Sequence, residues 1–196
     1  MPTTMSTTHA LAWHFVGDTL RDGKPIPQDG IWLHHLSTCV MCESGLHASR
    51  RILDALVYAP GATICRVECA DIVGEEKNKL VAKSRKILWR INGEEVLRAF
   101  AEQLSLSSLS PRVPRHPVGR FVIKDSTLVW YKAGPSSWSA ANCAVRNKCW
   151  GVYWNERTSM GRASKEMWDA ARNVEDESNA TLTQMVLKAS GQEDIA

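Results

Sequence analysis

The segment from residue 42 to residue 68, CESGLHASRRILDALVYAPGATICRVE, constrains the fold of this chain more than any other stretch. Apolar residues at positions 52, 53, 56 and 57 follow the spacing of one helix face, and Pro60-Gly61 is a stop signal behind them. Over residues 62–72 the side chains then alternate with the period of a strand. The segment therefore predicts a turn with Ser49 as the helix N-cap, a short helix, and a strand whose Cys65 and Cys69 face the core.

Shorter patterns on either side of this segment complete the predicted fold. Residues 11–16 and 31–36 each predict a strand, and residues 120–134 predict a β-hairpin. Residues 93–104 carry one apolar stripe and two glutamates near their N-terminal end, which predicts a helix. Residues 77–91 fit either a strand or a helix. The fold class that follows is α+β: a small mixed or antiparallel sheet with one or two helices, followed by a helical C-terminal segment.

The predicted division of the chain has four parts. They are a disordered leader over 1–10, an α+β domain over 11–132, a helical C-terminal segment over 133–190 and a frayed tail over 191–196. We expect the helical segment to end in a short helix over 179–189. It also carries tryptophans at positions 138, 150, 154 and 168, and their helical spacing favours packing in a core over stacking on bases or sugars.

Composition narrows the class of protein. The 196 residues are 44% hydrophobic and 23% charged, which is typical of a soluble globular protein. No apolar run approaches the length of a membrane span, and the first residues lack the pattern of a signal peptide, so we expect a cytoplasmic protein with no membrane partner. We expect reduced, mostly buried thiols at the six cysteines. The Cys39-x-x-Cys42 pair could begin a zinc site completed by other cysteines and histidines, but no second paired knuckle follows, so we expect no metal.

Positive charge gathers in the middle of the chain. Residues 77–124 hold eleven basic and three acidic side chains, a net charge of +8, whereas residues 165–196 hold three basic and seven acidic ones, a net charge of −4. A surface for nucleic acid or another acidic partner would use the first six of these cations: Lys77, Lys79, Lys83, Arg85, Lys86 and Arg90. The interpretation that we favour is a solvated face, partly neutralised by the acidic tail.

Histidines supply the first candidates for chemistry. His34, His35 and His47 lie within fourteen positions, and histidine is a common general base. His47 is the strongest of the three because it follows a glycine in a predicted turn, and loops carry function more often than regular elements do. Tyr58 shares a helix face with Asp54 and could look into a pocket that His47 borders. We expect instead that the Tyr58 ring packs in the core with its hydroxyl at the rim.

Several motifs resemble a family of uncharacterised proteins encoded by bacteriophages and prophages. The family carries a GLHAS or GFHA turn, a DAL.YAPG helix end and a strand ending in RVE, which in this chain are residues 45–49, 54–61 and 66–68. The stretches LRDGKPIPQDGIWLHH and VAKSRKILWRI are also similar, as is an Ala/Trp-rich helical C-terminal region closing on LTQM. The chain departs from the family over 136–172, where the Ala/Trp repetition is eroded. The resemblance implies a viral or prophage origin and no established activity.

A shorter pattern in the same segment is similar to mono-ADP-ribosyltransferase-like domains. The resemblance implies that His47 stands where many members have tyrosine, and that Ser49 stands at the small hydroxyl position. It implies that His34 or His35 is the first-strand histidine, that Glu68 is the candidate glutamate, and that NAD is the cofactor.

Two functional classes therefore stay open. The first is a phage or prophage accessory protein that binds a host or defence component, protein or nucleic acid, in the host cytoplasm and without a cofactor. The second is an ADP-ribosyltransferase-like enzyme that uses NAD, with catalytic candidates His47, Ser49, His34, His35, Tyr58 and Glu68. We favour the first class because the residues around His47 include no clear catalytic acid.

Overall fold

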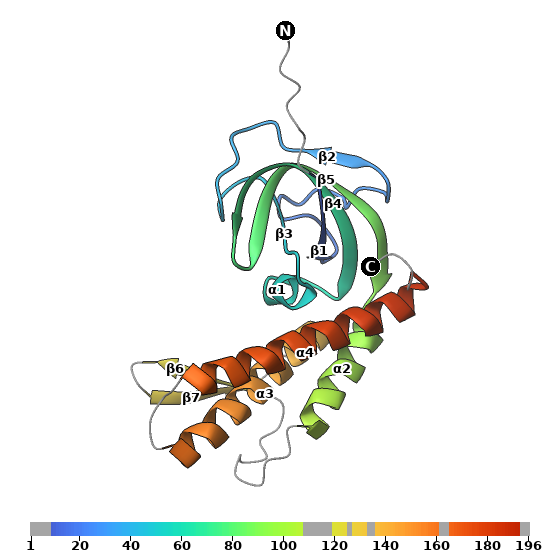
Figure 1. Cartoon of the computed structure of the whole chain (residues 1–196). Helices are drawn as coiled ribbons and strands as arrows, with labels where there is room; N and C mark the ends of the chain where they lie inside the picture. Colours follow the sequence, from blue (N-terminus) through green and yellow to red (C-terminus); the bar gives the residue numbers. More distant parts are fainter. Residues whose placement is uncertain (1–8, 108–118, 125–126, 133–135, 161–164, 193–196) are drawn as a thin grey trace. The chain divides into compact units, whose positions relative to one another are not determined.

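A computed structural model describes residues 9–107, 119–124, 127–132, 136–160 and 165–192 of the chain (Figure 1). The chain forms two compact units, which are residues 1–92 and residues 93–196. The described parts contain an antiparallel five-stranded sheet, a two-stranded hairpin and four helices. The predicted α+β class is therefore confirmed.

The first unit consists of five strands and one short helix. In chain order they are β1 (Ala10–Val16), β2 (Trp32–His34), β3 (Leu46–Ala48), α1 (Ile52–Val57), β4 (Thr63–Glu76) and β5 (Lys79–Asn92). The strands predicted over 11–16, 31–36 and 62–72 correspond to β1, β2 and β4. The ambiguous residues 77–91 lie almost entirely in β5, because they pair along the whole of β4 as a long hairpin.

Backbone pairing closes the sheet into a ring. β1 pairs with the outer edge of β4, while the far edge of β5 takes β2 at residues 84–86 and β3 at residues 80–82. Ser49, directly after β3, then pairs back to Trp13 of β1 through two hydrogen bonds of 2.7 and 3.0 Å. The ring β1–β4–β5–β3 therefore leaves few unpaired strand edges. Figure 1 shows the strong curvature of β4 and β5 that this closure requires.

The inside of the ring is the first hydrophobic core. Because side chains alternate along a strand, every second residue points inward. The inward set is Ala10, Ala12, Val16, Ala48, Cys65, Val67, Cys69, Leu80, Ala82 and Ile87, with Ile26 and Ile72 packed against it. The prediction that Cys65 and Cys69 share a buried face is therefore confirmed, and both are fully buried.

Two local predictions around the opening segment are wrong. The turn expected over residues 45–49 is strand β3, because its backbone pairs with β5. Ser49 does not cap α1: the N-cap residue is Arg51, without a side-chain hydrogen bond. The Ser49 hydroxyl instead donates to the carbonyl of Asn78, at 2.8 Å, so it joins β3 to the tip of the β4–β5 hairpin.

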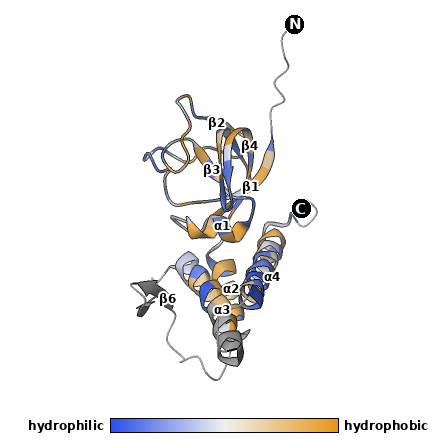
Figure 2. Ribbon diagram, turned by 60° about the vertical axis from the view of Figure 1, so that its left-hand side comes forward, coloured by the Kyte–Doolittle hydropathy of each residue, from blue (hydrophilic) through white to orange (hydrophobic). Residues whose placement is uncertain are grey.

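The second unit is mainly helical. It contains α2 (Glu94–Ser107), β6 (Gly119–Lys124), β7 (Thr127–Lys132), α3 (Ser137–Met160) and α4 (Lys165–Ser190). α2 packs against α3 and α4, and the predicted stripe of Leu97, Phe100 and Leu104 is buried. Figure 2 shows hydrophobic and hydrophilic residues interleaved along α4, whereas α1 of the first unit is mostly hydrophobic.

The observed division of the chain differs from the predicted one. The first unit ends at Asn92, not at residue 132, because α2 and the β6–β7 hairpin contact α3 and belong with the helices. The short helix expected over 179–189 is the end of the much longer α4, and Ala10 of the expected leader lies in β1. Residues 1–8 of that leader and 193–196 of the expected tail lie outside the described residues.

Of the four tryptophans predicted to pack in a core, Trp138 is partly buried, one is exposed and two are untested. Trp168 is 55% exposed, so it does not pack in a core. The side chains of residues 150 and 154 lie outside the described set. In the parts of the chain that the structure describes, no helix is both long and apolar enough to cross a membrane.

Candidate functional site

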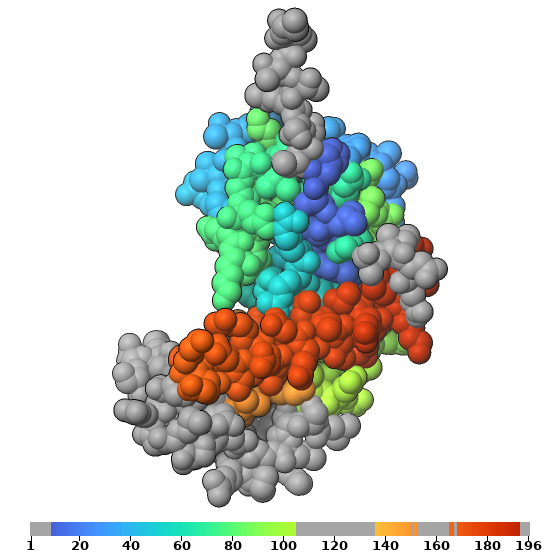
Figure 3. Space-filling model, in the orientation of Figure 1, coloured from blue at the N-terminus to red at the C-terminus, as the bar shows by residue number. Residues whose placement is uncertain are grey.

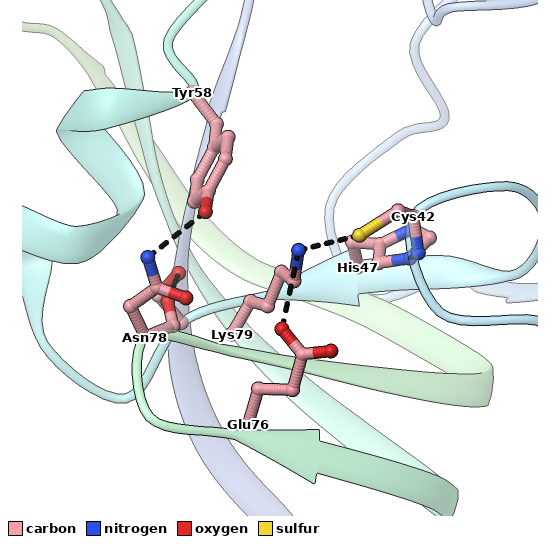
Figure 4. A network of polar contacts seen from close by, with 7 residues as sticks. Cys42, His47, Tyr58, Glu76, Asn78 and Lys79 are labelled. Carbon is pink, nitrogen blue, oxygen red and sulfur yellow. Dashed lines mark hydrogen bonds and ion pairs between the residues drawn. The ribbon is translucent and has the colours of Figure 1, made fainter.

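Six polar side chains meet where the loop before β3, the end of α1 and the tip of the β4–β5 hairpin come together. We call Cys42, His47, Tyr58, Glu76, Asn78 and Lys79 the Cys42 cluster (Figure 4). They derive from four segments, which are the loop before β3, β3 itself, the end of α1 and the hairpin tip, and the closed ring brings these segments side by side. The space-filling view shows α1 and the hairpin exposed on one face of the first unit (Figure 3).

Lys79 is the centre of the Cys42 cluster. Its ammonium donates a hydrogen bond to the Cys42 sulfur and lies 3.4 Å from a Glu76 carboxylate oxygen. The same ammonium lies 5.7 Å from the centre of the Tyr58 ring, within the range of a cation–π contact. These contacts raise the pKa of Lys79, the hydrogen bond to Cys42 being the largest cause, so Lys79 stays charged near pH 7.

His47 holds the loop that presents Cys42. The backbone of Cys42 has a φ of 70°, and its N–H donates to Nε2 of His47 at 3.1 Å. Nε2 can accept this bond only when it carries no proton. Burial lowers the pKa of His47, partly offset by a hydrogen bond to the backbone of Gly45, and the charges of Lys79 and Arg85 lower it further. His47 is therefore a neutral positioning residue near pH 7.

Tyr58 lies at the exposed side of the cluster. Its hydroxyl accepts a hydrogen bond of 2.9 Å from the Asn78 side chain, and the residue is 53% exposed. The prediction that its ring packs in the core is therefore wrong. Tyr58 is the C-cap residue of α1, so it falls just beyond the buried stripe of that helix.

Two other predicted site residues belong to a second group. Glu68, on the outer face of β4, accepts bonds of 2.8 Å from His9 and from Lys86. Lys86 lies 4.7 Å over the Trp32 ring, and Trp32 stacks on His34. We call these five residues the Trp32 cluster. The hydrogen bonds from Lys86 and then His9 lower the pKa of Glu68, so this carboxylate is ionised and already hydrogen-bonded to both side chains.

The predicted catalytic set is thus divided. His47 and Tyr58 lie in the Cys42 cluster, and Glu68 and His34 lie in the Trp32 cluster. Ser49 is buried and joins the strands, as described above. His35 pairs its backbone N–H with the carbonyl of Lys83, and its buried Nε2 has no hydrogen-bond partner in the described residues.

The six cations of the predicted partner face do not form one surface. The Arg85 side chain is buried inside the ring, and Arg90 is paired with Asp29 at 2.7 Å. Lys79 and Lys86 belong to the two clusters described above. Lys77 and Lys83 are exposed, and no ion pair to either is found among the described residues. The favoured interpretation of a solvated face therefore holds for Lys77 and Lys83 alone. Lys79, Lys86 and Arg90 are paired with acidic residues of the first unit, and neutralisation by the acidic tail stays a prediction.

The cysteines are free thiols. Cys65, Cys69 and Cys143 are buried as predicted, whereas Cys42 is exposed. Within the described ranges, no three histidine, cysteine or acidic side chains are grouped as a metal site would need. Cys39 donates weakly to the Ala82 carbonyl, at 3.8 Å, and so faces β5.

Sequence reasoning missed the residue that gives the site its chemistry. The sequence indicated Lys79 only as a surface cation, although it contacts Cys42 across 37 positions of sequence. Asn78 and Glu76, at the hairpin tip, were also missed. One sequence signal was available. Two strands of equal length on either side of residues 76–79 place these residues at the tip of a hairpin. An exposed thiol beside a cation is the setting in which cysteines react as nucleophiles.

The chain was also compared with known proteins. A family model described as a domain of unknown function (DUF7666) matches residues 11–99, which span the ring, α1 and the beginning of α2. The chain is similar to that family over this range. No curated protein and no solved structure matches the chain.

Proposed function

We propose that this chain is a phage- or prophage-encoded accessory protein that acts in the host cytoplasm by binding a host or defence protein. The observation that carries the proposal is a set of exposed apolar side chains on the segments that form the Cys42 cluster. Leu36 and Val40 lie in the loop before β3, and Val57 and Tyr58 lie at the end of α1. We call these four residues the apolar surface. Leu36 is 96% exposed, and Val40 lies two residues before Cys42.

Exposed apolar groups next to ordered polar groups are typical of protein interfaces. The centre of an interface is enriched in aromatic and apolar residues, and tyrosine is a frequent hot spot. Here Tyr58 is held by Asn78 and Lys79, so little side-chain freedom would be lost on binding. The Cys42 cluster would then supply hydrogen-bonding groups at the edge of the contact.

A protein partner is favoured over nucleic acid. Affinity for nucleic acid comes mainly from cations that contact phosphates. Four of the six candidate cations are already buried or engaged, which leaves Lys77 and Lys83. Two cations would give weak and strongly salt-dependent binding.

The ADP-ribosyltransferase-like alternative ranks second. It requires a histidine and a glutamate at one NAD site, but His47 and Glu68 lie in different clusters. Glu68 is also engaged by Lys86 and His9.

The proposal is tested by capture from host lysate. The immobilised wild-type chain is expected to retain a defined protein that Leu36→Asp and Tyr58→Asp variants lose. Leu11→Asp is the matched control, because Leu11 is a 44% exposed apolar residue of β1 opposite Glu68, away from the Cys42 cluster. Equal capture by all variants, or capture that nuclease treatment abolishes, would contradict the proposal.

A second measurement separates binding from the enzyme alternative. Addition of millimolar NAD is expected to leave the melting temperature unchanged. A rise that His47→Ala removes would instead favour the ADP-ribosyltransferase-like alternative.

A further inference from the structure

One cation of the first unit lies inside the ring without a matching negative charge. Arg85 is only 7% exposed, and it pairs in register with Cys69, so its side chain shares the inward face of β5. Its Nη1 donates to the carbonyl of His47, and that is its one hydrogen bond within the described residues. A buried guanidinium is stable only when its charge and its donors are satisfied.

The unused edge of Arg85 has the geometry of an anion receptor. Nη1 is occupied by His47, which leaves Nε and Nη2 as two parallel donors on one side of the guanidinium. Arg50 uses the same edge on a carboxylate: its Nε and Nη2 donate to the two oxygens of Glu75 at 2.6 and 2.9 Å. This two-donor edge is the one that recognises carboxylate and phosphate oxygens in general.

The neighbours of Arg85 inside the ring supply no negative charge near pH 7. Burial raises the pKa of Cys65 and of Cys69 to about 11 although the Arg85 charge acts against it, so both thiols are neutral. His14, on β1, also lies close enough to feel that charge: burial and then Arg85 hold its pKa well below the usual value. His14 as a whole residue is partly buried.

Short side chains make up much of the inward set around the guanidinium. Four residues of the inward set are alanines, at positions 10, 12, 48 and 82. His14 follows Ala10 and Ala12 in the inward register of β1, so its ring and the Arg85 guanidinium are the polar groups among small neighbours. An oxyanion there would accept two hydrogen bonds from Arg85 and one from His14.

From these contacts we infer that the inside of the ring is a binding site for a small oxyanion, with the Nε–Nη2 edge of Arg85 as its receptor and His14 as a second donor. The ligand class is a carboxylate or a phosphate group, which share two coplanar oxygen atoms. The site is separate from the apolar surface, so the inference does not depend on whether the chain binds a partner protein.

The test is thermal unfolding of the full chain while chloride is replaced by acetate or by phosphate at constant ionic strength. A ligand that binds only the folded state raises the melting temperature with saturation. We expect this rise for the wild-type chain, its loss in Arg85→Met, and a much smaller rise in Arg85→Lys, which keeps the charge but not the two-donor edge. A rise with acetate alone assigns a carboxylate, and a rise with phosphate alone assigns a phosphate.

Lys83→Met is the matched control, because Lys83 is an exposed cation two positions away on the same strand. It should keep the full rise. No saturable rise in the wild-type chain, or an equal rise in Arg85→Met, would overturn the inference. If the Arg85 variants do not fold, the Nε–H resonance of Arg85 in the wild-type chain decides: it should shift with saturation during the titration, and a resonance that does not move refutes the site.

Discussion

At the scale of single residues, the contact between Lys79 and Cys42 places a cation against an exposed thiol. The Lys79 ammonium donates a hydrogen bond to the Cys42 sulfur, and an exposed cysteine beside a cation is the setting in which thiols react as nucleophiles. Cys65, Cys69 and Cys149 differ because burial raises the pKa of each thiol to about 11. Cys42 is the exposed cysteine of the described set, and it has a cation against its sulfur.

Replacement of Lys79 by methionine should slow alkylation of Cys42. Removal of the ammonium takes away its attraction for the anionic sulfur, and at an exposed site this changes the rate by about three- to tenfold. The measurement is mass spectrometry of iodoacetamide-treated protein over time, near pH 7. Lys77→Met is the control and should react like the wild-type chain, because Lys77 is exposed and has no hydrogen bond or ion pair to Cys42 among the described residues. Equal rates in all three proteins would show that the cation does not activate this thiol.

The two inward thiols of β4 predict how stability depends on alkaline pH. The pKa of each rises from 9.0 to about 11 in the folded chain because burial disfavours the thiolate. The folded state then holds these protons more tightly than the unfolded state. The buried protonated thiols therefore contribute fully to the free energy of unfolding below pH 9, and this contribution is lost as the pH rises towards 11. We expect a loss on the order of 2 kcal/mol per thiol.

Urea unfolding below and within this pH window measures the effect. The double variant Cys65→Ala, Cys69→Ala should show a shallower decline of the free energy of unfolding than the wild-type chain, whatever its stability at neutral pH. Identical slopes would mean that the thiols ionise equally in both states.

At the scale of elements, the loop between β2 and β3 is shaped by its packing against β5. Gly45 has a φ of 103°, and a Cβ built there would lie 2.5 Å from a Val81 methyl group and 3.0 Å from the Cys39 sulfur. The GLHAS sequence therefore needs its glycine for two reasons, backbone conformation and close approach. Both reasons serve to bring Cys42 and His47 over the hairpin.

Gly45→Ala should destabilise the first unit much more than Gly30→Ala. Both glycines have a positive φ, but a Cβ at Gly30 would meet nothing within 4 Å. The strained backbone alone costs about 1 kcal/mol, and overpacking at position 45 should bring the total there to about 2–4 kcal/mol. Chemical denaturation of the two variants measures the difference. Equal losses would mean that the loop moves away from β5 at no cost.

At the scale of the whole molecule, each unit has a hydrophobic core of its own. The first is the inward set of the ring, and the second is built from buried side chains of α2, α3 and α4, including Phe100 and Leu182. The match to a domain of unknown function covers the first unit from residue 11 onward and stops within α2, at residue 99. The matched range therefore contains almost the whole ring.

A fragment of residues 1–92 should fold without the helices. Its ring contains every strand that pairs with β4 and β5, so its backbone hydrogen bonds are complete within the fragment. We expect a single cooperative thermal transition by circular dichroism, and dispersed amide signals by NMR. A gradual transition would show that the ring depends on residues 93–196.

The sequence by itself determined the elements whose signal is local. The alternation over Cys65, Val67 and Cys69 sets the inward face of β4, and the spacing of Leu97, Phe100 and Leu104 sets the buried face of α2, because the period of the apolar residues matches the geometry of the element. Pairing between distant segments has no such local signal. Only the tertiary structure made residues 46–48 a strand and closed the ring between Trp13 and Ser49. It also brought Lys79 to Cys42. It turned Arg85 towards the inside of the ring and Glu68 towards the outside. Those positions depend on register across the hairpin, where a shift of one residue would exchange the two faces of the sheet.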